Sequence, residues 1–118
     1  MRVVVTGVCS SGKTTLVKSL QEAGIDAYNV AQEHSGIKKL WNKKNPDILI
    51  VLDAKITTIR QRRVVPWGEE RLVVQRERLV DAYQHADLYL QTDELSRDDV
   101  VQNVLEYIRR NSHANDYC

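Results

Sequence analysis

Four segments of the chain carry the hydrophobic pattern of buried strands. They are rich in β-branched or aliphatic residues and are bounded by residues that favour turns: Arg2–Thr6, Ile25–Val30, Ile48–Leu52 and Asp87–Leu90. Ile48–Leu52 is apolar at every position, which is expected of a strand covered on both faces of a parallel sheet. The pattern therefore predicts a small sheet of about four strands.

Between these segments, apolar residues recur every three or four positions, which is the spacing of an amphipathic helix. The spacing predicts helices over Lys13–Ala23, Lys55–Arg63 and Glu69–Ala86, and a last helix after Ser96. In the third of these helices, five side chains are expected to face the core: Leu72, Val73, Leu79, Val80 and Tyr83. The last helix has the clearest apolar stripe: Val100, Val101, Val104, Leu105 and Ile108.

Two serines stand where helices are expected to begin. Ser35 precedes an apolar stripe that includes Trp41, so it is expected to cap a short helix that ends at Asn45–Pro46. Ser96 has Asp99 three residues later, which is the pattern of a capping box.

Strands that alternate with helices indicate an α/β fold, in which a parallel sheet lies between two layers of helices. We expect a three-layer α/β/α domain over residues 1–110 and a polar, disordered tail over 111–118. Right-handed crossovers place the carboxyl ends of all parallel strands at one edge of the sheet, and ligands bind at that edge. Four segments are expected there: Gly7–Lys13, Ala31–Ser35, Asp53–Ala54 and Gln91–Glu94.

Composition and charge narrow the class of protein. The 118 residues include 17 basic and 16 acidic ones, and the net charge of +1 argues against a nucleic-acid-binding protein. The longest aliphatic run, Ile48–Leu52, is far shorter than the ~20 residues of a membrane span, so no membrane partner is expected. Val3–Val5 is too short for the core of a signal peptide. Cys9 and Cys118 are expected to be reduced thiols, which favours a cytoplasmic location.

Gly7–Thr14 reads GVCSSGKT and matches the phosphate-binding pattern G-x-x-x-x-G-K-[ST] at every fixed position. The motif follows an expected strand and opens an expected helix, which is the context that such a loop requires. Gly7 and Gly12 allow the backbone to wrap around phosphate oxygens. Successive N–H groups, those of Ser10 and Ser11 included, then point into one anion-binding hollow.

Three residues at the start of the following helix add charge and hydroxyl groups to this hollow. Lys13 can reach the β- and γ-phosphates of a nucleotide, and the Thr14 hydroxyl is placed to bind Mg²⁺. Thr15 is expected to donate to the α-phosphate, and the positive end of the helix dipole points to the same place. The loop is therefore expected to hold ATP or ADP, with Mg²⁺ as the cofactor.

With this loop as its first motif, the chain resembles the P-loop kinases, in particular shikimate kinase and the nucleoside-monophosphate kinases. Three stretches carry the resemblance: VVVTGVCSSGKTT, ILIVLDAKITTIRQRR and HADLYLQTDELSRDDVVQNVLEYI. Only the first is highly specific. The resemblance implies a P-loop NTPase fold and transfer of the γ-phosphoryl group of Mg·ATP to a small-molecule acceptor.

The resemblance also implies roles for residues outside the loop. Arg60 matches the arginine that stacks on adenine, and a planar guanidinium suits that role. Arg62 and Arg63 would open a lid over the phosphates that spans residues 62–70. The segment from Thr92 to Leu95 would lie beside the adenine edge. For each arginine, a solvent-exposed helix face is the alternative.

Other positions depart from those kinases. Only residues 31–47 separate the second strand from the third, so the acceptor-binding subdomain and one strand of the kinases are expected to be missing. Asp53 either contacts Mg²⁺ through water or caps the next helix. Glu33, after the second strand, is a candidate general base or water-orienting group. Lys13, Glu33 and Asp53 are the candidate catalytic residues, whereas His34 is expected to be an exposed loop residue.

The expected function is that of a kinase-like phosphotransferase that uses Mg·ATP and an acceptor that the residues do not identify. A nucleotide-dependent switch or ATPase module is the alternative, and a non-catalytic nucleotide-binding relative is the third interpretation. A protein partner or a homo-oligomer would then supply the missing acceptor site.

Overall fold

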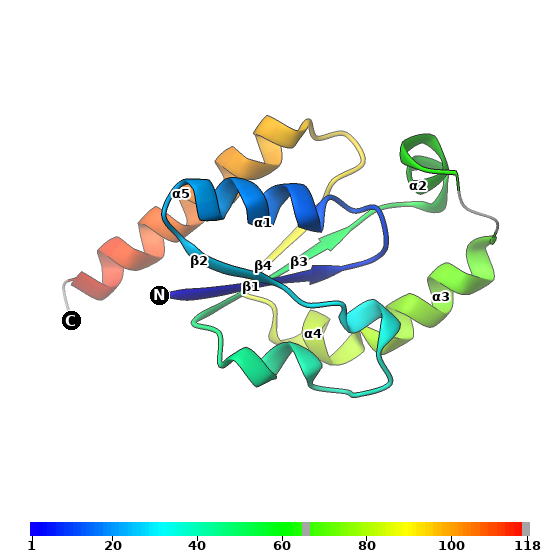
Figure 1. Cartoon of the computed structure of the whole chain (residues 1–118), viewed down its shortest axis with the longest axis horizontal. Helices are drawn as coiled ribbons and strands as arrows, with labels where there is room; N and C mark the ends of the chain where they lie inside the picture. The colour runs from blue at the N-terminus through cyan, green and yellow to red at the C-terminus, as the bar shows by residue number, and fades with distance from the viewer. Residues whose placement is uncertain (65–66, 117–118) are drawn as a thin grey trace.

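The computed structural model describes residues 1–64 and 67–116, with side chains as far as Asn111. Its centre is a sheet of four parallel strands: β1 (Arg2–Gly7), β2 (Asp26–Asn29), β3 (Ile48–Asp53) and β4 (Leu88–Gln91). The strands lie in the order β2-β1-β3-β4, so β1 and β3 are central (Figure 1). All neighbouring pairs are parallel, which confirms the predicted α/β fold with a small parallel sheet.

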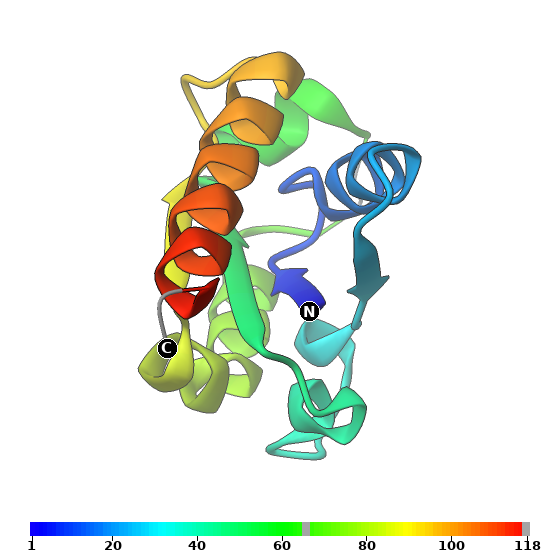
Figure 2. The same cartoon turned by 90° about the vertical axis from the view of Figure 1, so that its left-hand side faces the viewer.

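Five α-helices and two short 3₁₀ helices accompany the strands in the described part of the chain. They are α1 (Lys13–Glu22), η1 (Gln32–His34), η2 (Leu40–Lys44), α2 (Ile56–Arg62), α3 (Glu69–Arg78), α4 (Val80–His85) and α5 (Arg97–Asp116). Helices α1 and α5 cover one face of the sheet, while α3, α4 and the 3₁₀ helices lie on the other (Figure 1). Figure 2 shows this arrangement from the end near which both termini lie. None of these described helices is both long and apolar enough to cross a bilayer.

Alternate residues of the two central strands fill two separate cores. In β1, Val3 and Val5 belong to the core beneath α1 and α5, whereas Val4 belongs to the core on the opposite face. The same alternation places Ile50 of β3 in the first core and Val51 in the second. All five side chains are inaccessible to solvent. Burying each of them contributes about 1.5–3 kcal/mol relative to an exposed side chain.

Strand β1 ends at a glycine because its neighbour β3 leaves no room for a side chain there. Gly7 pairs with Leu52 of β3 and has a φ of 150°. A Cβ at Gly7 would lie 2.1 Å from the Leu52 carbonyl oxygen. The next residue, Val8, donates its N–H to the same oxygen at 3.3 Å. The glycine therefore fixes the point at which the strand ends and the loop towards α1 begins.

The single helix predicted over Glu69–Ala86 is wrong, because this segment forms α3 and α4, which meet at Leu79. The Leu79 N–H is shared between two carbonyl oxygens of α3 at 3.1 Å, which tightens the turn. Val73 and Val80, expected to face the core, are 48% and 46% exposed. Five residues of this segment are buried, of which the first and third were predicted: Leu72, Gln75, Leu79, Asp81 and Ala82. Gln75 can be buried because its amide oxygen accepts a backbone hydrogen bond there.

The helix predicted between Ser35 and Asn45 forms only in part, as the 3₁₀ helix η2, which ends before Asn45 as predicted but does not begin at Ser35. The Ser35 hydroxyl accepts a hydrogen bond from the Ile37 N–H at 3.0 Å, which forms a local turn, and η2 begins only at Leu40. The fully buried Gln32 organises this segment instead. Its Nε2 donates to the Ile37 carbonyl at 2.7 Å, and its Oε1 accepts the Trp41 N–H at 2.9 Å. One side chain thus satisfies backbone groups that a regular helix would have paired.

The start of α5 confirms the predicted capping box. The Asp99 N–H donates to the Ser96 hydroxyl at 3.0 Å, and the Ser96 N–H donates to the Asp99 carboxylate at 3.1 Å. Three members of the predicted stripe are buried in the first core: Val100, Val104 and Ile108. The helix continues to Asp116, so it runs into the segment for which a polar, disordered tail is expected. Residues 117–118 of that tail lie outside the described residues.

Replacing Gly7 with alanine is expected to lower the free energy of unfolding by about 1–3 kcal/mol, because the φ of this position is strained for an L-residue and the Cβ meets Leu52. Gly36→Ala is the matched control, since no atom lies within 4 Å of a Cβ there. Urea denaturation measures both changes. Equal stability of Gly7→Ala and the wild type would contradict this steric constraint.

Candidate functional site

The loop between β1 and α1 lies at the carboxyl edge of the sheet and makes a tight turn. Ser10 and Gly12 have positive φ values of 59° and 103°. The N–H and the hydroxyl of Ser11 both donate to the Val8 carbonyl oxygen, at 3.3 and 2.7 Å. The turn brings the start of α1 back over the end of β1 (Figure 1).

The N-terminus of α1 has no side-chain cap. Its N-cap is Gly12, and the first hydrogen bond of the helix runs from the Leu16 N–H to the Gly12 carbonyl at 3.0 Å. The N–H groups of Lys13, Thr14 and Thr15 therefore have no acceptor within the helix. Together with the positive end of the helix dipole, these groups make a site that favours an anion.

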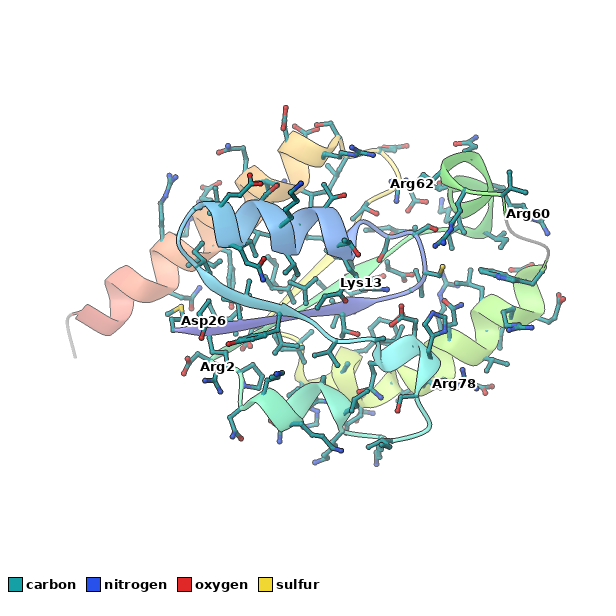
Figure 3. The ribbon with its side chains drawn as sticks, viewed as in Figure 1. Arg2, Lys13, Asp26, Arg60, Arg62 and Arg78 are labelled. Carbon is teal, nitrogen blue, oxygen red and sulfur yellow. The ribbon has the colours of Figure 1, made fainter. Side chains whose placement is uncertain are left out.

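The Lys13 side chain folds back across this loop and is 9% exposed (Figure 3). Its ammonium donates to the carbonyl oxygens of Gly7 and Val8, at 2.7 and 3.0 Å, and to the carboxylate of Glu33. An ammonium group has three hydrogens, so each of them has an acceptor. Removing either partner of such a buried ion pair leaves an uncompensated charge and costs about 3–5 kcal/mol.

Glu33 approaches Lys13 from η1, which follows β2. Its Oε2 pairs with Lys13 and lies 3.7 Å from His34 Nε2. Its Oε1 is buried and has no hydrogen-bond partner among the described residues. A buried carboxylate oxygen without a partner carries a desolvation penalty, so a ligand that donates a hydrogen bond to Oε1 is favoured.

A cavity of about 290 Å³, here called the polar cavity, opens beside the ion pair. It is lined by Cys9, Ser10, Gly12, Lys13, Thr14, Thr15, Asn29, Ala31, Glu33, His34 and Arg63. Thr14 is exposed, and its hydroxyl accepts a hydrogen bond from Asn29 Nδ2 at 3.2 Å. The cavity therefore combines a cationic group, a carboxylate and a hydroxyl within one hollow.

A second cavity of about 300 Å³, here called the apolar cavity, adjoins the same loop. It shares four lining residues with the polar cavity: Ser10, Gly12, Thr15 and Arg63. Leu16, Leu95 and Val100 give it an apolar wall. Thr92, at the end of β4, also lines it, and the Thr92 hydroxyl donates to the Ser11 carbonyl at 3.0 Å. An elongated ligand with a charged and an apolar part fits two adjoining cavities of this kind.

Two arginines of α2 lie differently with respect to the loop. The Arg62 guanidinium donates to the Ser10 carbonyl and to the Thr92 hydroxyl, at 3.0 Å each, and to the Thr92 carbonyl. Arg62 also lines the apolar cavity. Arg60 is exposed and is not among the described residues that line either cavity. Figure 3 shows the two side chains leaving α2 in different directions. The residue after the helix, Arg63, lines both cavities.

Asp53 belongs to a buried polar cluster and is not among the residues that line the cavities. Its carboxylate accepts hydrogen bonds from the Ala54 N–H at 2.9 Å, from Arg76 at 3.3 Å and from the Tyr89 hydroxyl at 2.6 Å. Burial, and next the bond to Asp53, raise the pKa of Tyr89 well above its usual value. Burial also raises the pKa of Tyr83 to about 12. Both phenols stay protonated at neutral pH, and the geometry does not favour a contact between Asp53 and Mg²⁺.

Most residues that the sequence nominates for the site come together at this edge of the sheet. Those that line at least one cavity are Ser10, Ser11, Gly12, Lys13, Thr14, Thr15, Glu33, Arg62, Arg63, Thr92 and Leu95. Gly7 contributes a carbonyl to Lys13. Asn29 and Gln75 contact the loop without having been predicted. The sequence signal for Gln75 is its place three residues after Leu72 and four before Leu79, on the stripe of those two core residues.

A Mg²⁺ ion that accompanies a triphosphate takes oxygen ligands, most of them from phosphate and water. The exposed Thr14 hydroxyl in the polar cavity is a protein oxygen that fits this role. Among the side chains of residues 1–64 and 67–111, no three His, Cys, Asp or Glu gather as a metal-binding group.

No protein-family model and no curated protein matches the chain. The functional proposal therefore depends on the geometry around the loop. That geometry consists of an uncapped helix terminus, a buried lysine–glutamate pair and two adjoining cavities.

Proposed function

We propose that this chain binds Mg·ATP on the loop Gly7–Thr15 and acts as a kinase-like phosphotransferase of the P-loop NTPase class. One observation carries the proposal. The uncapped N-terminus of α1 lies where two cavities of different polarity adjoin, and the buried Lys13 lines the polar one. The motif GVCSSGKT in a strand–loop–helix context supports phosphate as the anion that this site takes.

In this proposal the triphosphate and the base of the nucleotide occupy different cavities. The triphosphate lies along residues 12–15, where the helix dipole and the backbone N–H groups favour negative charge. The base lies in the apolar cavity, against Leu95 and Val100. The guanidinium of Arg62, held by the loop and by β4, supplies a planar cation on which a base can stack.

Lys13 has to release one of its three acceptors before it can bind a phosphate. The carbonyls of Gly7 and Val8 are parts of the loop backbone, whereas Glu33 is an anion that competes with phosphate for the same ammonium. Phosphate binding therefore separates Lys13 from Glu33. The released carboxylate lines the polar cavity, where it can orient an attacking hydroxyl and accept its proton. Mg²⁺, when bound at the Thr14 hydroxyl, neutralises charge on the phosphates.

A nucleotide-dependent switch or ATPase module is the second candidate function. Between β2 and β3 the chain forms only the short helices η1 and η2, with no further subdomain beside the polar cavity. In a switch, a protein partner or a second copy would complete the acceptor site, or water would take the acceptor's place. A nucleotide binder without catalysis is the limiting case.

Mg·ATP is expected to raise the Tm of the wild type, because a ligand at 100 times its Kd stabilises the folded state by about 2.7 kcal/mol. Lys13→Ala should lose most of this shift, since it removes the charge that faces the β- and γ-phosphates. Lys18→Ala is the matched control, because Lys18 is an exposed lysine of the same helix. Thermal unfolding with and without Mg·ATP measures the shifts. A full shift in Lys13→Ala would refute the site.

Arg62→Ala is expected to weaken ATP binding by about 1 kcal/mol, which is the scale of a partly exposed cation–π contact. Arg60→Ala should bind ATP as the wild type does, because Arg60 is exposed outside the apolar cavity. Isothermal titration calorimetry of the two variants measures the difference. If Arg60→Ala alone weakened ATP binding, Arg60 and not Arg62 would be the arginine that stacks on the base, as the sequence suggests.

The isolated chain is expected to turn over ATP well below the ~1–100 s⁻¹ of working kinases, because the short segment between β2 and β3 offers little to position an acceptor. Glu33→Gln should lower phosphate release by at least about tenfold. The same change should tighten ATP binding, since a neutral amide competes less well for Lys13 than a carboxylate does.

Asp53→Asn is the comparison variant for Glu33→Gln. The dependence of its ATP turnover on the Mg²⁺ concentration should match that of the wild type. The measurements are the release of inorganic phosphate from ATP and the transfer of its γ-phosphoryl group to a panel of small hydroxyl compounds. Rapid transfer to one compound would contradict slow turnover and establish a kinase. Weaker ATP binding in Glu33→Gln would contradict the competition between Glu33 and phosphate.

A further inference from the structure

A glutamine of α3 reaches the phosphate loop from a distant part of the sequence. Gln75 is 2% exposed, and its Oε1 accepts the Cys9 N–H at 2.9 Å. The bond joins residues 66 positions apart. It links the loop directly to a helix that lies on the opposite face of the sheet from α1.

This bond acts on the peptide group between Val8 and Cys9. In a trans peptide the N–H and the C=O point in opposite directions. Because the N–H is directed at Gln75, the Val8 carbonyl is directed the other way. There it accepts the Lys13 ammonium at 3.0 Å and the Ser11 hydroxyl at 2.7 Å. Gln75 therefore orients an acceptor of Lys13 without touching Lys13.

Two residues that follow Gln75 fasten the same helix to the ends of two other strands. Arg76 donates to the Asp53 carboxylate at 3.3 Å and to the Ala54 carbonyl at 3.2 Å, after β3. Arg78, labelled in Figure 3, donates to the Glu33 carbonyl at 3.3 Å, after β2. Through residues 75–78, α3 thus contacts the chain at or just after the carboxyl ends of β1, β2 and β3. This anchoring gives Gln75 a fixed position from which to hold the loop.

We propose that Gln75 is a positioning residue of the phosphate loop: it orients the Val8–Cys9 peptide, and through the Val8 carbonyl it holds Lys13 in place for a triphosphate. The inference rests on the proposed function, because the triphosphate is the ligand that Lys13 serves. An apolar side chain at position 75 leaves the Cys9 N–H without this acceptor and frees the peptide to rotate. The loop then binds phosphate less tightly, because it has to be ordered on binding.

Amide hydrogen exchange of the wild type, followed by NMR, tests the contact without any substitution. The Cys9 N–H is expected to exchange at least about tenfold more slowly than in an unstructured peptide, because a buried acceptor holds it. Exchange at the unstructured rate would overturn the proposal. Protection of Cys9 in a wild type that binds no triphosphate would refute the proposed function and still support the orientation of the loop by Gln75.

Calorimetric titration with Mg²⁺ and inorganic triphosphate then measures the effect on binding, because this probe contacts the loop without a base. Gln75→Leu is expected to raise the Kd about tenfold, whereas Gln84→Leu, at an exposed position of α4, should keep the wild-type Kd. A folded Gln75→Leu with the wild-type Kd would overturn the proposal.

Gln75→Glu keeps an acceptor oxygen and serves if the leucine variant does not fold. Slow exchange and a wild-type-like chemical shift of the Cys9 amide in Gln75→Glu would support the proposal. An unprotected Cys9 amide in that variant would overturn it, because the carboxylate offers the same bond.

Discussion

The ammonium of Lys13 joins three parts of the chain that are separate in the fold. It starts from the first residue of α1, bonds two carbonyls of the loop after β1, and pairs with a carboxylate that follows β2. Buried ion pairs contribute little net stability, because desolvation offsets most of their attraction. Stability is therefore a weak explanation for this pair. Exchange of the Glu33 carboxylate for a phosphate anion explains it better, since the lysine then has a partner in both states.

The surrounding residues maintain the geometry that this exchange requires. Gly7 allows the strand to end against Leu52 without a side chain in the way. Gln75 turns one loop carbonyl towards the ammonium. Arg78 holds the backbone of Glu33 from the other side. Because α3 carries two of these contacts, a ligand that moves the loop or Glu33 also acts on α3, which gives a switch a physical route to the opposite face of the sheet.

The strands and the tight loop between β1 and α1 could be predicted because their signals are local. A run such as Ile48–Leu52 needs only its own composition to indicate a strand covered on both faces. The loop has fixed residues at fixed spacing, and its neighbours have the expected periodicity. The capping box of Ser96 and Asp99 is likewise a pattern of two residues three positions apart. Each of these predictions is independent of how distant segments meet.

Contacts between distant segments were not predicted, because no local pattern in the sequence indicates them. A polar residue at an inward helical position is assigned to solvent unless its partner is known, and the partner of Gln75 is 66 residues away. With Gln75 assigned to solvent, the predicted stripe included Val73, which the structure shows to be 48% exposed. Arg60 and Arg62 are two positions apart, so a similarity in sequence cannot decide which of them faces the loop. The hydrogen bonds of Arg62 decide it.

A structure of the chain with Mg²⁺ and a non-hydrolysable ATP analogue tests the central claim most directly. We expect the β- and γ-phosphates within hydrogen-bonding distance of Lys13 Nζ and of the N–H groups at the start of α1, with the Glu33 carboxylate moved away from Lys13. An analogue bound elsewhere, or phosphates out of reach of a Lys13 that remains paired with Glu33, would contradict the claim.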